Sequence, residues 1–144
     1  MAAPQRRSDC PINFGLELFG DKWTLLVVRD MMFKGKHGYG AFLESGEHIA
    51  TNILADRLHQ LEVAGLIVKR VDPARKSRFI YALAERGIDL LPVMVEIILW
   101  SAQHDPLTAA TPEFVAAAHA DRAGLIAGIR MQLETKLAEV RALP

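Results

Sequence analysis

The sequence predicts a mainly α-helical fold that contains one small β-hairpin. Most apolar side chains recur every three or four residues, a spacing that is typical of helices with one buried face. Two short runs, residues 66–71 and 79–83, are instead rich in β-branched and aromatic residues and favour paired strands. The chain has 144 residues, of which 51% are hydrophobic and 24% charged, so it can form one globular domain.

Two helices are expected before residue 34. Cys10-Pro11 begins the first one, because a proline at the first helical position loses no hydrogen bond, and Gly20 ends it. Asp21 is a favourable N-cap for the second helix, which we expect from residue 22 to about residue 33. Residues 34–40 then form a glycine-rich turn. A short helix follows and carries Tyr39, Phe42 and Leu43.

The helix expected over residues 49–64 has two distinct faces. Leu54, Leu58 and Leu61 lie within about 60° of one another at about 100° per residue, so they form a narrow apolar stripe. Polar side chains occupy the opposite face, and Gly65 is the expected C-terminal stop. This helix is therefore expected to pack on a core with one side and to present polar groups on the other.

The two strand-like runs flank a turn-rich segment, residues 72–78, so the pattern predicts a β-hairpin with a basic tip. The whole chain is neutral, with 17 Lys and Arg residues against 17 Asp and Glu residues. A local basic cluster on a neutral protein is typical of a small electrostatic docking surface, and an ordinary solvated face is the alternative. Residues 66–81 contain one acidic residue, Asp72, and five basic residues, which are Lys69, Arg70, Arg75, Lys76 and Arg78.

The C-terminal part of the chain is expected to form two long helices. The first runs from residue 84 to about residue 103, and Pro92 inside it predicts a kink. The second begins at Thr111-Pro112-Glu113 and continues to the last residues, with Gly124 and Gly128 weakening its middle. The expected organisation is an N-terminal arm (1–9), a domain (10–103) and a C-terminal helical extension (104–144).

The order of elements is helix, helix, short helix, helix, hairpin, helix, helix, which is the plan of a winged helix-turn-helix domain. In this plan the helix over residues 49–64 fits the major groove of DNA, and its outward side chains reach base edges. The basic hairpin contacts the backbone or the minor groove. The sequence therefore predicts a sequence-specific DNA-binding regulator that is not an enzyme. The helices that begin near residues 85 and 111 cannot both bury all of their apolar faces on so small a core. We therefore expect them to form a homodimer interface together with the first helix.

The candidate DNA contacts follow from this plan. Asp56 has two open interpretations, acceptance of a hydrogen bond from a cytosine amino group or an ion pair with a nearby Lys or Arg. Arg57 on the flank of the helix forms either a salt bridge or a phosphate contact. For base edges we expect Thr51, Asn52, Ala55, Asp56 and His59. For the backbone or the minor groove we expect Lys36, Lys69, Arg75, Lys76 and Arg78.

A set of short motifs keeps its order and spacing across residues 9–101. The motifs are Cys10-Pro11, Gly20-Asp21-Lys22-Trp23-Thr24-Leu25-Leu26 with Arg29-Asp30, Ile53-Leu54-Ala55-Asp56-Arg57-Leu58, Leu61-Glu62, Gly65-Leu66, Tyr81-Ala82-Leu83, Gly87, Leu90-Leu91-Pro92 and Trp100. In these motifs the chain resembles the HxlR-type transcriptional regulators, which are winged helix-turn-helix proteins. The resemblance implies a homodimer that binds near-palindromic operator DNA and represses or activates nearby genes.

The chain departs from this family pattern at three positions. Ala50 and Ala84 replace a serine and a threonine that would cap helices, and we expect Thr51 to cap the helix over residues 49–64 instead. Asn52 replaces a common Arg or Lys. This change favours adenine in the operator, because asparagine pairs well with that base.

Cys10 is the only cysteine, so the chain has no internal disulfide and no multi-cysteine zinc site. Its place at a helix start favours the reactive thiolate, although Asp9 opposes this effect. The resemblance implies a redox sensor at this position in some members of the family, and a small buried or capping residue is the alternative. Oxidation could yield only an intermolecular disulfide, a mixed disulfide or a sulfenic acid.

Two other function classes remain open. One is a small thiol-dependent enzyme that uses Cys10, although no histidine or second cysteine is placed as an obvious base. The other is a winged-helix interaction module that binds no DNA. No metal and no cofactor is expected, since His37, His48 and His59 fall on three different elements. The expected partners are double-stranded operator DNA, a second copy of the chain and a small-molecule effector between the helices.

The hydropathy of the sequence also indicates where the protein is located. The first ten residues contain no apolar core of the kind found in a secretory signal. Residues 90–100, the most apolar long stretch, are far shorter than the ~20 residues that span a bilayer. We therefore expect a cytoplasmic protein that is not inserted in a membrane.

Overall fold

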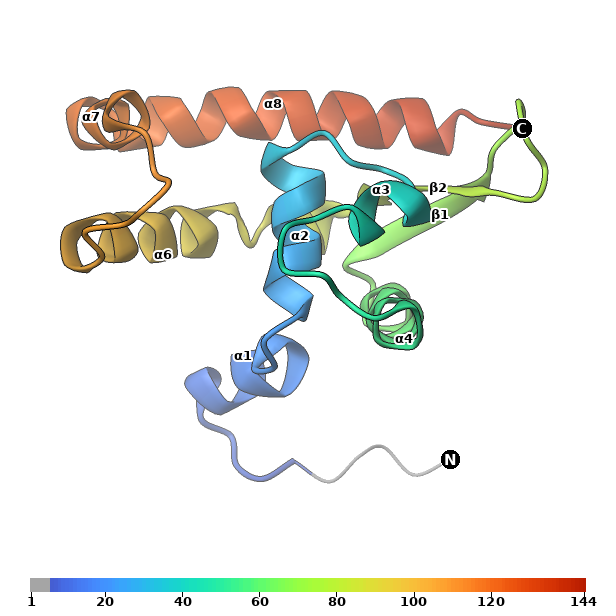
Figure 1. Cartoon of the computed structure of the whole chain (residues 1–144), viewed down its shortest axis with the longest axis horizontal. Coiled ribbons are helices and arrows are strands. Elements are labelled where there is room, and N and C mark those ends of the chain that lie inside the picture. The colour runs from blue at the N-terminus through green and yellow to red at the C-terminus, as the bar shows by residue number, and fades with distance from the viewer. Residues whose placement is uncertain (1–5) are drawn as a thin grey trace.

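The computed structural model of the protein describes residues 6–144, and within this range it contains eight helices and one β-hairpin (Figure 1). The predicted fold class, mainly α-helical with a small β-hairpin, is confirmed. No helix in residues 6–144 combines the length and the hydropathy needed to cross a bilayer. The elements are α1 (Pro11–Phe19), α2 (Thr24–Phe33), α3 (Tyr39–Leu43), α4 (Thr51–Val63), β1 (Ile67–Val71), β2 (Phe79–Leu83), α5 (Glu85–Ile88), α6 (Leu91–His104), α7 (Pro112–Ala120) and α8 (Arg122–Arg141).

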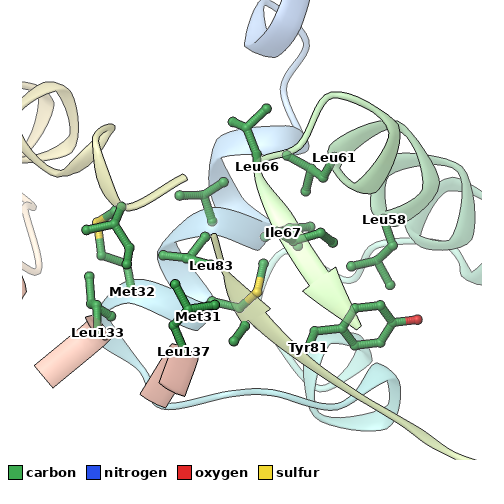
Figure 2. Packing of buried hydrophobic residues seen from close by; sticks show 14 of the residues in the cluster. Met31, Met32, Leu58, Leu61, Leu66, Ile67, Tyr81, Leu83, Leu133 and Leu137 are labelled. Atoms are coloured by element: carbon green, nitrogen blue, oxygen red, sulfur yellow. The ribbon is translucent and has the colours of Figure 1, made fainter. Parts of the chain in front are cut away.

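The hydrophobic core lies where α2, α4, the hairpin and α8 meet (Figure 2). Leu54, Leu58 and Leu61 of α4 are at most 3% exposed, so the predicted apolar stripe is confirmed. Met31 of α2 and Leu137 of α8 belong to the same cluster. Because full burial of a leucine side chain contributes roughly 1.5–3 kcal/mol, this stripe holds α4 firmly on the core.

The hairpin has α4 on one side and α8 on the other (Figure 1). Its strands are antiparallel, with Ile67 opposite Leu83. On α8, the apolar stripe of Leu133, Leu137 and Val140 is buried, and α8 contacts both strands. The C-terminal extension therefore shares one hydrophobic core with the elements that precede it.

Two of the expected helices are each divided in two. The helix predicted from residue 84 to residue 103 is α5 followed by α6, and Pro92 lies in the first turn of α6 rather than at a kink. A proline is tolerated there because the first N–H groups of a helix have no partner within the helix. The last helix is α7 followed by α8, and Asp121, with φ −154° and ψ 81°, separates them.

Asp121 also explains the glycine at position 124. The Asp121 carboxylate accepts a hydrogen bond from the Gly124 N–H at 2.9 Å and thereby caps α8. A Cβ atom at position 124 would lie 2.2 Å from Asp121 Oδ2, which is too close. Glycine therefore permits the cap, whereas the sequence pattern indicated only a weaker helix. The predicted cap of α7 is confirmed, because Thr111 accepts from the Phe114 N–H at 3.1 Å.

The predicted side-chain cap of α4 is wrong. Ala50 is the N-cap residue, and no side chain in residues 6–144 makes a cap hydrogen bond there. Instead, the Tyr39 hydroxyl donates to the Thr51 carbonyl at 2.8 Å and ties α3 to the first residue of α4. Asp21 does accept backbone hydrogen bonds at 2.8 and 3.0 Å, as its sequence position predicts. The helix that follows it begins at Thr24, later than the expected residue 22.

Candidate nucleic-acid interface

The side of α4 that faces away from the core is open to solvent. The leucine stripe holds the opposite side of the helix, so outward side chains have no core to pack on. The structure brings all five predicted base-reading residues together on this exposed side. They are Thr51, Asn52, Ala55, Asp56 and His59.

Asp56 already has partners on its own helix. Its Oδ2 accepts hydrogen bonds from Gln60 Nε2 at 3.0 Å and from the guanidinium of Arg57. Of the two interpretations of Asp56, the structure therefore contains the ion pair. A carboxylate offers about four acceptor positions, so this pair leaves room for a further donor.

Arg57 ties α4 to the start of α2. Its Nε donates to Asp21 Oδ1 at 3.0 Å, so the structure shows the salt-bridge interpretation of Arg57. Burial raises the pKa of Asp21, but hydrogen bonds from Thr24, Trp23 and Arg57 outweigh it and lower this pKa to about 2. The carboxylate is therefore ionised at neutral pH and holds α4 against α2.

A second polar network holds the turn between α3 and α4, and the sequence analysis missed it. Arg29 donates to Glu47 at 2.7 and 2.8 Å and to buried Asp30 at 3.0 Å, and Ser45 also donates to Asp30. The hydrogen bond from Arg29 lowers the pKa of Glu47 to about 2. Lys36, a predicted phosphate contact, donates to Ser45 Oγ at 2.8 Å, so it supports this turn from inside. The adjacent Arg29-Asp30 pair was the one signal in the sequence.

The wing comprises β1, β2 and the connecting residues 72–78. Asp72 shapes its tip, because its Oδ1 accepts from the Ala74 N–H at 2.9 Å and its own N–H donates to the Arg78 carbonyl at 2.9 Å. Three predicted DNA contacts are exposed here, and none of them forms an ion pair with a residue of the described chain. These cations are Arg75, Lys76 and Arg78.

Lys69 belongs to the wing but is not at its tip. Its ammonium pairs with Glu62 of α4 at 3.4 Å and lies 4.5 Å from the centre of the Phe79 ring. Arg70 donates to the Lys69 carbonyl at 2.9 Å. Lys69 therefore joins the wing to α4, in addition to any contact that it makes with DNA.

The helices α1 and α6 present apolar side chains to solvent. No residue of α1 is buried, and Ile12 is 72% exposed. Trp100 of α6 is 66% exposed, and a groove of about 350 Å³, lined by Phe14 and Val93 among others, separates the two helices. The exposed apolar side chains of α1 and α6 are Ile12, Phe14, Leu16, Val93, Ile97 and Trp100.

Cys10 is exposed at the N-cap position of α1. Its carbonyl accepts from the Phe14 N–H at 3.0 Å, and its N–H donates to Ser8 Oγ at 3.3 Å. Within residues 6–144, no imidazole or carboxylate is hydrogen-bonded to its thiol. The nucleophile–base pair that a thiol-dependent enzyme needs is therefore not formed in the described chain.

Comparisons with known proteins agree with this architecture. The sequence pattern of the HxlR-like helix-turn-helix family matches residues 18–108. The chain is 37% identical over 86 residues to the uncharacterized HTH-type transcriptional regulator sll1512 of Synechocystis sp., a match that covers 60% of this chain and 63% of that protein. It is 30% identical over 95 residues to the HTH-type transcriptional regulator YodB of Bacillus subtilis, covering 65% of this chain and 84% of that protein.

Solved structures share the fold. The reduced form of YodB superposes with a TM-score of 0.56 at 27% identity and covers 70% of this chain and 99% of that chain. PA1607 superposes with a TM-score of 0.64 at 32% identity and covers 74% of each chain. Structures of YodB also include a quinone-bound and a diamide-treated form. The chain described here belongs to the HxlR-like helix-turn-helix family of winged-helix transcriptional regulators.

Proposed function

We propose that the chain is a sequence-specific DNA-binding transcriptional regulator that acts as a homodimer. The observation that carries this proposal is the exposed polar side of α4 together with the three wing cations that have no acidic partner in residues 6–144. In this arrangement α4 enters the major groove, where Asn52 contacts a base edge. Arg75, Lys76 and Arg78 then contact the backbone or the minor groove.

The exposed apolar side chains of α1 and α6 support the homodimer. Several large apolar side chains exposed on neighbouring helices are typical of an interface. Leu107, in the C-terminal extension, is also exposed. A two-fold pairing through these helices would place the two copies of α4 on successive major grooves, about 34–36 Å apart.

The test of the proposal is a fluorescence-anisotropy titration of the full chain at fixed salt. The two probes are a duplex from the upstream region of the gene and a scrambled duplex of the same composition. We expect preferential binding to the upstream duplex, with an affinity that falls as salt is raised because phosphate contacts release counterions. Salt-insensitive self-association without binding to either duplex would instead favour the interaction module.

We infer that Cys10 is the site through which oxidants or electrophiles change the affinity for DNA. Its thiol is exposed at the start of α1, one of the two helices of the proposed interface. The solved quinone-bound and diamide-treated forms of YodB support a search for the same kind of signal here. With one cysteine per chain, a disulfide formed by diamide joins two chains or joins the chain to a small thiol.

The redox inference is tested by repeating the titration with diamide on the wild-type chain and on Cys10→Ser. We expect diamide to change the affinity of the wild type for the upstream duplex and to leave Cys10→Ser unaffected. Binding by the wild type that diamide does not change would contradict the inference. In that case the search turns to a non-covalent effector, for which the groove of about 630 Å³ between α6 and α7, lined by Trp100 and His119 among others, is the first place to examine.

A further inference from the structure

A groove of about 720 Å³ separates α3 from the wing. One wall contains Gly38 and Gly40, and Arg78 and Phe79 lie on the other. We call it the α3–wing groove. The Tyr39 hydroxyl ties α3 to the first residue of α4, so the groove lies between the wing and the short helix that adjoins α4. Glu44 is the one acidic side chain among the residues that line it.

The glycine wall of this groove is held on both sides. The Tyr81 N–H donates to the His37 carbonyl at 2.8 Å, and His37 Nδ1 lies 2.9 Å from the Tyr81 carbonyl oxygen, so the segment before Gly38 is tied to β2. After Gly38, the Tyr39 hydroxyl donates to the Thr51 carbonyl of α4 at 2.8 Å. The groove is therefore formed before a partner arrives, which lowers the entropy lost on binding.

The fold itself does not require glycine at positions 38 and 40. The described glycines with positive φ are Gly35 and Gly65, whereas Gly38 has an ordinary extended backbone with φ −128°. A Cβ atom added to Gly38 or Gly40 would meet no heavy atom of the described chain within 4 Å. At Gly87, by contrast, an added Cβ would lie 2.2 Å from a backbone oxygen. Gly40 lies inside α3, where alanine would favour the helix more than glycine does.

The charge around the α3–wing groove indicates what fills the space. Arg78 lines the groove without an acidic partner in residues 6–144, and Arg75 and Lys76 lie next to it at the tip. These cations match a polyanion. Glycine next to a groove is typical of a place where another backbone approaches closely. A sugar–phosphate strand has both properties, and phosphate contacts of this kind position a protein on DNA without reading sequence.

We propose that the α3–wing groove receives one sugar–phosphate strand of the DNA, and that Gly38 and Gly40 leave the space that this strand fills. The proposal rests on the proposed DNA-binding function and adds a contact that does not depend on base sequence. A side chain at position 40 would then keep the strand away from the wall without disturbing the fold.

The test compares Gly40→Ala and Gly40→Gln with Gly128→Ala and Gly128→Gln. Gly128 is a matched control because it is also an exposed glycine within a helix, and an added Cβ there also meets nothing within 4 Å. All four variants keep the net charge. Each full-length chain is titrated against the upstream and the scrambled duplex at fixed salt, and its thermal unfolding is recorded to show that it is folded.

We expect Gly40→Gln to weaken binding to both duplexes by about tenfold, Gly40→Ala to weaken it less, and neither substitution to lower the unfolding temperature. The two Gly128 variants should bind as the wild type does. Glu44→Gln should tighten binding to both duplexes severalfold, because it removes a negative charge that repels phosphate.

Three outcomes would overturn the proposal. If Gly40→Gln binds as tightly as the wild type while the wild type prefers the upstream duplex, the groove is not the path of the strand and the proposed function stands. A loss confined to the upstream duplex would show a base contact in place of a backbone contact. If the wild type binds neither duplex, the proposed function fails, and this inference fails with it.

Discussion

Arg57 of α4 and Asp21 at the start of α2 are joined by a hydrogen bond of 3.0 Å from Nε to Oδ1. The same carboxylate accepts the backbone hydrogen bonds that begin α2. The helix proposed to read DNA is therefore anchored by a side chain on its flank, while its outward side chains remain available to bases. In this arrangement Arg57 positions α4, and its role is separate from that of Asn52 or His59.

Replacing Asp21 by alanine should lower the free energy of unfolding by about 1–2 kcal/mol, because the substitution removes a helix cap together with the anchor of Arg57. Affinity for all duplexes should fall as well, since α4 is less firmly placed. Urea unfolding of Asp21→Ala and Asp9→Ala checks this, because the side chain of Asp9 is 98% exposed. Equal losses in the two variants would contradict the anchoring role.

The decrease in the free energy of unfolding at acid pH should depend on Asp21 and Glu47. The pKa of each is lowered to about 2 in the folded chain. A carboxyl group whose pKa is lowered by folding stabilises the folded state fully above its unfolded pKa, and this contribution is lost as the pH falls through the folded pKa. We expect the free energy of unfolding to decrease from about pH 5 towards pH 2, and less steeply in an Asp21→Asn, Glu47→Gln variant. Urea unfolding at a series of pH values measures the slope, and an unchanged slope would exclude these two groups.

Substitutions on α4 and on the wing should have different effects on DNA binding. Asn52→Ala should relax the preference at one base pair by about 1–3 kcal/mol, because it removes a base-edge contact. Arg78→Ala should weaken binding to every duplex and reduce the dependence of affinity on salt, because it removes a phosphate contact. Anisotropy titrations over a panel of single-base operator variants at several salt concentrations separate the two. Identical behaviour of the two variants would show that these roles are wrongly assigned.

A charge placed on α1 should separate the proposed homodimer. Ile12→Asp puts a carboxylate into an apolar interface, whereas Met131→Asp puts the same group on α8 at a side chain of similar exposure, 69% against 72%. Sedimentation velocity over a range of concentrations should show monomers for Ile12→Asp and dimers for the wild type and for Met131→Asp. Dimers that persist in Ile12→Asp would place the interface elsewhere.

Truncation of a buried side chain on α8 should destabilise the whole domain. Leu137→Ala removes a buried leucine that packs in the core with the hairpin and α2, so we expect a loss of about 2–5 kcal/mol in the free energy of unfolding. Met131→Ala on the exposed side of α8 should change it by less than about 0.5 kcal/mol. Urea unfolding, expected as a single cooperative transition, measures the free energy of unfolding of both variants. A small decrease in Leu137→Ala would mean that α8 does not share the core.

The faces of helices could be predicted from the sequence, but their partners could not. The 3.6-residue period determines that Leu54, Leu58 and Leu61 share one side of α4. The same reasoning identifies an apolar side on the last helix, yet periodicity contains no information on whether that side packs on its own chain or on a second copy. In the structure Leu133 and Leu137 pack with the hairpin and α2 of the same chain. This choice of partner depends on tertiary contacts, which the periodicity of one helix does not contain.

Individual lysines were the least predictable part of the candidate site. Lys36 and Lys69 both lie near the expected interface, but each ammonium has a partner inside the chain, Ser45 for Lys36 and Glu62 for Lys69. A flexible four-carbon side chain reaches many acceptors, so sequence position alone does not select one. The helix breaks at Leu90 and Asp121 could not be predicted either. The apolar residues on the two sides of each break keep the spacing of one continuous helix.

The packing of α8 on the hairpin has a consequence for the time at which the wing is completed. Leu133 follows Leu83 by 50 residues in the chain, so a growing polypeptide makes the strands long before the helix that covers them. At synthesis rates of roughly 5–20 residues per second, the hairpin waits for several seconds with one apolar side uncovered. A two-stranded hairpin is at best marginally stable alone. We therefore expect the wing to be stabilised only after α8 has been made, although it is encoded near the middle of the chain.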